Sequence, residues 1–147
     1  MGDGMMLSEG TVNQTAWMLS RAYLLNGRED YLKPANKREG LVHQYGFNKE
    51  KRAWYANVAK DSSAYHRPLA YWWTQAYGGM FNLNLYRIDK QDIHLDNFRQ
   101  GSDFWDKYFL DKRDGDTFQG VSLSGEPIDT VKQIHTRLPF TIWKIPC

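Results

Sequence analysis

"AYWWTQAYGGMF", residues 70–81, lies in the long aromatic helix that the sequence predicts over 68–87. Neighbouring residues on an α-helix point about 100° apart, so Trp72 and Trp73 cannot face the same side. One of them can line a pocket while the other packs between helices; the alternative is that both belong to the core. The two glycines that follow each lower helix propensity by about 1 kcal/mol relative to alanine, which indicates close helix packing or room for a ligand.

The rest of the chain repeats this kind of helix in a regular order. Helices are predicted over 11–27, 29–45, 68–87 and 91–110. A polar, turn-rich segment follows each helix pair: residues 46–60 predict a small β-hairpin or an irregular loop, and residues 111–127 predict a turn, a short strand and a Ser-Gly turn. Four identities recur at a constant offset of 63 (86 − 23 for the first), namely Tyr23 and Tyr86, Leu32 and Leu95, Tyr45 and Tyr108, and Lys49 and Lys112. We therefore predict a structural repeat whose helical hairpins stack to bury their apolar sides.

The helix ends carry local signals. Thr11 followed by Gln14 resembles a capping box at the start of the first helix. Gly27 is a good stop at the end of that helix. Pro34 and Gly40 are expected to interrupt the second helix.

A ring of hairpins explains the long connections better than a linear stack does. Repeats of linear solenoids usually span about 34–47 residues, which is shorter than the unit here. Long connections gathered on one side of a fold usually serve function. The fold class is therefore all-α, part of an α/α toroid of helical hairpins with short β-hairpins in its loops. We expect residues 1–147 to form one partial domain, which is either part of a larger protein or associates with itself to cover its open edges.

The composition of the 147-residue chain indicates which classes of partner are expected. Hydrophobic residues make up 41% and charged residues 24% of it, so we expect a folded protein. The formal net charge of +2 argues against nucleic acid and anionic membranes as partners. A single cysteine, Cys147, no signal-like N-terminus and no long apolar run predict a cytoplasmic protein.

Three blocks resemble the C-terminal half of the N-acylglucosamine 2-epimerase family, which includes cellobiose 2-epimerases and aldose–ketose isomerases. The blocks are "GTVNQTAWMLSRAYLLNGREDYL" (10–32), "YWWTQAYGGMF" (71–81) and "FWDKYFLDKRDGDTFQGVSLSGEPIDTVKQIH" (104–135). The first is similar to the family's GHxxExxW helix and the second to its WWxQAE helix. The resemblance implies an (α/α)6 barrel that epimerises or isomerises a mono- or disaccharide.

The resemblance also implies a mechanism without a metal or organic cofactor. Removing the proton at C2 of an open-chain aldose gives an enediolate, and a histidine has a suitable pKa for that transfer. His135 matches the family's C-terminal catalytic histidine. Thr11, Gln14 and Tyr77 stand where the family has a histidine and two glutamates, and we expect them to contact the sugar by hydrogen bonds.

The remaining aromatic, amide and histidine residues are assigned to the sugar site, the core or the surface. Gln75 and at least one of Trp72 and Trp73 are expected to contact the sugar, by an amide and by stacking. Trp17 and Trp105 are expected in the core. The remaining histidines match no motif and are expected at the surface or its boundary, namely His43, His66 and His94.

Two alternatives remain open from the sequence. The chain can be a carbohydrate-binding member of the same fold that has lost catalysis. It can also be a glycosidase or polysaccharide lyase on the same fold, since one fold hosts many chemistries. A hydrolase needs two carboxylates at one bond, whereas acidic residues here gather in a turn, "DKRDGD" at 111–116.

Overall fold

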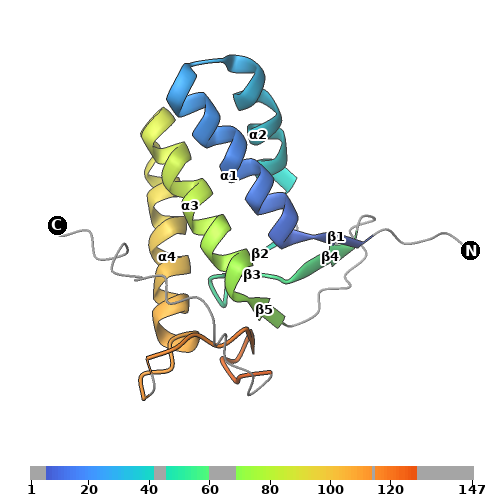
Figure 1. Ribbon diagram of the computed structural model, residues 1–147, viewed down its shortest axis with the longest axis vertical. Helices are drawn as coiled ribbons and strands as arrows, with labels where there is room; N and C mark the ends of the chain where they lie inside the picture. Colours follow the sequence, from blue (N-terminus) through green and yellow to red (C-terminus); the bar gives the residue numbers. More distant parts are fainter. Residues whose placement is uncertain (1–5, 42–45, 60–68, 114, 129–147) are drawn as a thin grey trace, which may run out of the picture.

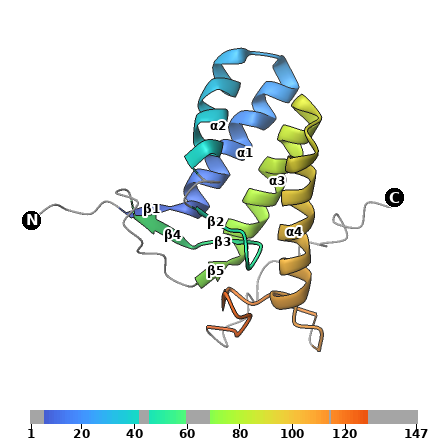
Figure 2. The same cartoon turned by 180° about the vertical axis from the view of Figure 1, so that it is seen from behind.

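The computed structural model describes residues 6–41, 46–59, 69–113 and 115–128. Within them the chain forms two helical hairpins, built from α1 (Glu9–Asn26), α2 (Glu29–Leu41), α3 (Trp72–Asp89) and α4 (Asp92–Tyr108). Helices α1 and α3 pack side by side, α2 packs on α1, and α4 packs on α3 (Figures 1 and 2). The prediction of helical hairpins with short strands between them is confirmed. No helix in the described part has the length and apolar character needed to cross a membrane.

Short antiparallel strands join the hairpins at one end. The pairs are β1 (Met6–Ser8) with β4 (Asn57–Ala59), β2 (Phe47–Asn48) with β3 (Ala53–Trp54), and β5 (Leu69–Tyr71) with β6 (Gly120–Ser122). Strands β2 and β3 are the hairpin predicted in the first connection. The Ser-Gly turn predicted in the second connection is present, with Gly125 at φ +93°.

The structural repeat predicted from the sequence is confirmed. Both ends of α1 precede the ends of α3 by the same offset of 63 (72 − 9 and 89 − 26), and the starts of α2 and α4 share that offset (92 − 29). The ladder of β1 with β4 recurs in β5 with β6 at the same offset, position for position. The pair Phe47–Trp54 recurs as the bridge Leu110–Thr117. The described chain thus contains two copies of one unit, and their inner helices α1 and α3 are equivalent.

The helix ends agree with the sequence in part. Gly27 ends α1 at φ +70° and donates its N–H to the carbonyl of Tyr23 at 2.7 Å, as predicted. The predicted capping box is wrong, because strand β1 runs directly into α1 at Glu9 and leaves Thr11 inside the helix.

Two further boundary predictions are wrong. Helix α2 continues through Pro34 and Gly40. Pro34 lacks the N–H that would donate to the carbonyl of Asp30, so the helix loses a single internal hydrogen bond near its start. Helix α3 begins at Trp72 rather than at 68, because the residues before it pair with β6.

The core forms around the inner helices in separate clusters. Ala16, Ala35, Phe81 and Leu85 form the cluster between α1, α2 and α3. A second cluster joins α4 to the strands and contains Ala53, Ala70, Phe104, Phe109, Val121 and Leu123. The fully buried Trp54 joins a third cluster. Its indole lies against α3 and α4 at Gly78 and Gly101, where an added Cβ would lie 2.7 Å and 2.5 Å from the ring. The glycine at 78 therefore serves close packing.

Candidate functional site

The two adjacent tryptophans of α3 face different sides of the helix. Trp73 is half-buried, and its ring stacks on Tyr71 at 4.5 Å with an angle of 8°. Trp72 packs against the core cluster of α4 and meets Trp105 edge-on at 6.2 Å. The two tryptophan rings also meet each other edge-on at 5.9 Å, so Trp72 joins the core cluster to the stacked pair of Tyr71 and Trp73.

One turn along α3, Tyr77 meets the neighbouring inner helix. Gln14 of α1 donates from its side-chain amide to the Tyr77 hydroxyl at 3.4 Å. The rings of Trp17 and Tyr77 lie 5.4 Å apart. Because residues four apart share one side of a helix, Trp73 and Tyr77 present their rings together. We call Trp17 of α1, Tyr71 at the end of β5, and Trp73 and Tyr77 of α3, with Gln14 beside them, the aromatic face.

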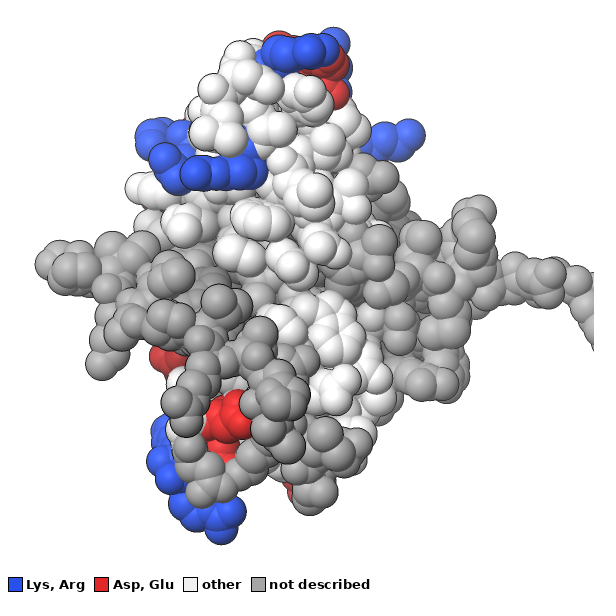
Figure 3. Space-filling model, in the orientation of Figure 1, with Lys and Arg blue, Asp and Glu red and all other residues white. Residues whose placement is uncertain are grey.

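The aromatic face carries little charge. In Figure 3 the charged side chains lie towards the ends of the hairpins, and the described surface between them over α1 and α3 is uncharged.

The shifted pKa values belong to side chains outside the aromatic face. A hydrogen bond from Arg28 lowers the pKa of Asp30 at the α1–α2 turn. A hydrogen bond from Lys51 lowers the pKa of Glu50 in the β2–β3 turn. No group of three His, Cys, Asp or Glu side chains in the described ranges could hold a metal ion.

Gln75 has a different environment from Tyr77. Its side chain is 2% exposed. Its amide oxygen accepts from the backbone N–H of Trp54 at 2.9 Å, and its amide nitrogen donates to the Trp54 carbonyl at 2.6 Å. The amide that the sequence assigns to a sugar hydroxyl thus binds the β2–β3 hairpin in this structure.

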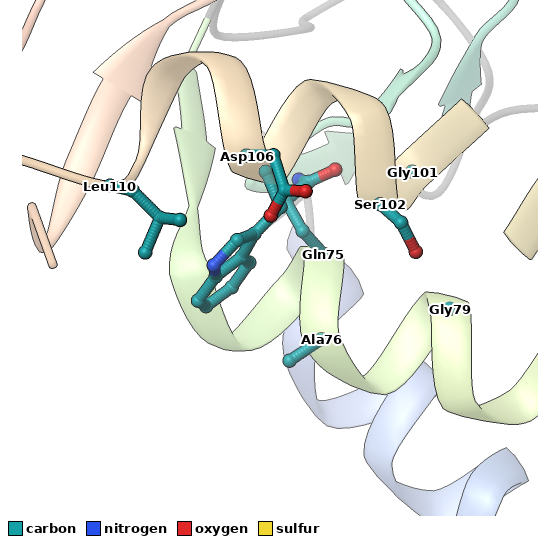
Figure 4. Close-up of a pocket in the computed structure, with 8 residues that line it drawn as sticks. Gln75, Ala76, Gly79, Gly101, Ser102, Asp106 and Leu110 are labelled. Atoms are coloured by element: carbon teal, nitrogen blue, oxygen red, sulfur yellow. The ribbon is translucent and has the colours of Figure 1, made fainter. Parts of the chain in front are cut away.

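A groove lies between α3 and α4, on the same side of α3 as Gln75 (Figure 4). Its walls also include Ala76, Gly79, Gly101, Ser102, Trp105, Asp106 and Leu110. Ala76 and Gly79 lie on α3 and Gly101 and Ser102 on α4, so small residues of both helices form the floor. The groove and the aromatic face occupy different sides of α3.

Several predicted residues lie elsewhere. His135, His43 and His66 lie outside the described residues. Thr11 lies near the start of α1, and the structure does not describe its side chain. His94 corrects the expectation of a surface histidine: it is 5% exposed, with Nε2 3.1 Å from the Asp89 carboxylate, because α4 begins at Asp92 and directs this turn towards the end of α3.

The tryptophans expected in the core are half-buried and pack on core clusters, Trp17 on that of α1 and Trp105 on that of α4. Sequence reasoning missed two aromatic residues. Tyr71 stacks on Trp73, and only the pairing of β5 with β6 places it there. Trp54 is completely buried. Gly78 of α3 and Gly101 of α4, which lie against its ring, were the signal in the sequence that could have indicated this position.

Solved structures share this arrangement. The cellobiose 2-epimerase of Bacillus thermoamylovorans matches 93% of this chain and 34% of its own length, with a TM-score of 0.76 and 16% identity. A D-mannose isomerase matches 86% of this chain and 33% of its own, with a TM-score of 0.77 and 18% identity. The α-mannanase of Bacteroides thetaiotaomicron, a family 76 glycoside hydrolase, matches 85% and 34%, with a TM-score of 0.68 and 20% identity.

These likenesses define the fold. The chain has the fold of part of an (α/α)6 barrel and spans about one third of the solved chains that it matches. No protein-family model matches the sequence, and no curated protein sequence matches it significantly. The fold predicted from the resemblance to sugar epimerases is confirmed.

Proposed function

We propose that this chain is part of a sugar 2-epimerase or aldose–ketose isomerase that acts on a mono- or disaccharide. The observation that carries the proposal is the aromatic face, where half-buried rings of two equivalent inner helices lie beside an amide. Sugars offer apolar C–H surfaces to such rings and hydroxyls to such amides. The fold likeness to a cellobiose 2-epimerase and a D-mannose isomerase supports the same substrate class.

The reaction needs a proton carrier near C2. The aromatic face offers the amide of Gln14 and the phenol of Tyr77, which orient hydroxyl groups but do not act as bases at neutral pH. Imidazole titrates in the neutral range, so it can remove a proton and return it. We assign that transfer to His135, by its match to the resembled family.

A second function is carbohydrate binding without turnover. The contact between Gln14 and Tyr77 favours it, because these residues stand where the resembled motifs have glutamates. An amide donating to a phenol leaves an uncharged, hydrogen-bonding surface. Such a surface binds a sugar and contributes no acid or base at that point.

Proton exchange separates the two functions. The protein is incubated in D₂O with mannose, glucose, N-acetylglucosamine, N-acetylmannosamine and cellobiose, and the C2 proton is followed by NMR. Exchange that His135→Ala abolishes and the control His66→Ala retains supports the epimerase or isomerase. Binding by calorimetry without exchange for any sugar supports a binding protein. Exchange that persists in His135→Ala removes His135 from the mechanism.

The two tryptophans test the aromatic face. Trp73→Ala should weaken sugar binding by at least about tenfold, equivalent to about 1.4 kcal/mol, with little loss of stability. Trp72→Ala should mainly lower the thermal midpoint, since its ring packs on a core cluster. Calorimetry and thermal melts of both variants check this, and equal sugar affinity for Trp73→Ala and the unmodified chain would remove Trp73 from the binding surface.

A further inference from the structure

Polar side chains are buried between the inner helices α1 and α3, which lie side by side (Figure 1). Asn13 and Ser20 of α1 are both 0% exposed, and Asn84 of α3 is 6% exposed. The side-chain amide of Asn13 donates to the carbonyl of Thr74 at 3.3 Å. The side-chain amide of Asn84 donates to the hydroxyl of Ser20 at 3.0 Å. A buried polar group that loses its partner destabilises the fold, so these contacts restrict how the two helices can lie against each other.

The contact of Asn84 with Ser20 continues into the backbone of the aromatic face. A hydroxyl group has one hydrogen to donate, and that of Ser20 donates to the carbonyl of Trp17 at 2.9 Å. Ser20 can therefore accept from Asn84 at the same time. Two successive hydrogen bonds thus join α3 to the residue of α1 whose ring meets Tyr77.

The contacts between α1 and α3 share one register. The two buried contacts join residues 61 and 64 apart, and the exposed amide–phenol contact joins residues 63 apart, so the two helices run in parallel with a nearly constant offset. A slide by one helical turn is about 5.4 Å and would bring Ala16 or Leu24 opposite Asn84 in place of Ser20. Neither of these side chains accepts a hydrogen bond, so the buried amide would lose its partner.

Apolar packing alone does not define this register. Ala16 packs in an apolar cluster with α3, and apolar attraction has no direction. The positions of α3 equivalent to Asn13 and Ser20 are Ala76 and Leu83 (13 + 63 and 20 + 63). The repeated unit therefore does not require polar side chains at these two positions, and their presence in α1 is specific to its contact with α3.

We propose that Asn13, Ser20 and Asn84 are positioning residues of the sugar site: their buried hydrogen bonds fix α1 against α3 and so hold the aromatic face in the geometry that binds the sugar. The effect on the sugar rests on the proposed function, whereas the control of the register does not. Replacing both partners of a buried hydrogen bond by apolar groups can leave stability unchanged, so an effect on geometry can be separated from an effect on stability.

Nuclear Overhauser contacts between the rings of Trp17 and Tyr77, whose centroids lie 5.4 Å apart, measure the register without a sugar. Ser20→Ala combined with Asn84→Leu makes the polar pair apolar, and the thermal midpoint should stay equal or rise. The ring contacts should nevertheless weaken, because the helices can then adopt more than one register. The exchanged pair, Ser20→Asn with Asn84→Ser, restores a hydrogen bond between the same positions and should restore the ring contacts.

The matched control removes a buried amide contact on the other side of α3. The side-chain amide of Asn97 in α4 donates to Asn82 at 3.2 Å, and both side chains are buried. Asn82→Leu combined with Asn97→Ala replaces this contact and should leave the ring contacts of Trp17 and Tyr77 unchanged. Equal weakening in the control and in the apolar pair would overturn the proposal, since any buried amide contact would then have the same effect.

Calorimetry with cellobiose and with mannose connects the register to binding. The apolar pair should bind about tenfold more weakly than the unmodified chain, and the exchanged pair and the control should stay within about twofold of it. Intact ring contacts in the apolar pair would overturn the proposal, and so would full sugar affinity in a variant that has lost them. If the unmodified chain binds neither sugar, the proposed function fails for them, and the ring contacts still decide whether the polar side chains fix the register.

Discussion

Gly101→Ala should destabilise the protein although alanine is the better helix residue. The added Cβ would lie 2.5 Å from Cζ3 of Trp54, closer than side chains pack, and the ring is completely buried. The ring cannot retreat towards α3, because Gly78 already touches it there. Overpacking of this kind costs about 1–3 kcal/mol, and improved helix propensity returns about 1 kcal/mol. With the ring confined, we expect a net loss of about 2 kcal/mol, or about 4–8 °C in the thermal midpoint.

Urea denaturation followed by tryptophan fluorescence measures this loss. The control is Gly40→Ala in α2, where nothing lies within 4 Å of the added Cβ and stability should stay equal or rise by up to about 1 kcal/mol. In a Trp54→Leu background the clash disappears, so Gly101→Ala should become neutral or stabilising. A stable Gly101→Ala variant, or an equal loss in both backgrounds, would refute the packing of Trp54 between α3 and α4.

Two further substitutions test single structural contacts. Gln75→Leu should cost about 2–4 kcal/mol in urea denaturation, because two buried backbone groups of Trp54 lose their partner; a loss as small as that of Gln14→Leu, whose side chain is exposed, would contradict this role. Gly27→Ala should lower the thermal stability by about 1 kcal/mol, since Gly27 has φ +70° at the end of α1; an unchanged midpoint would show that α1 ends differently in solution.

Much of the fold follows from patterns that are local in the sequence. Helical periodicity, Gly27 and four identities at a constant spacing were sufficient to predict two equivalent hairpins. The predicted start of α3 is wrong because pairing with a distant segment decides where that helix begins. Tyr71 belongs to a strand rather than a helix because Gly120 pairs with it from the far end of the described chain.

The candidate site was predictable from the sequence only where local spacing decides it. Spacing of four residues places Trp73 and Tyr77 on one side of α3, and the sequence contains that spacing. It does not contain the partner of Gln75, since Trp54 reaches α3 only through the β2–β3 hairpin. A buried amide and an exposed amide look alike in a sequence, so the assignment of Gln75 to a sugar was open until its neighbour was known.

The repeat also changes how the departures from the resembled motifs are understood. Gln14 and Tyr77 each replace a glutamate of those motifs. In the sequence alone, these replacements look like two separate losses of a carboxylate. In the structure they occupy the same position of two equivalent units and share one hydrogen bond at 3.4 Å. Two carboxylates at that contact would repel, whereas an amide and a phenol attract. The two replaced positions therefore meet in one uncharged contact between α1 and α3.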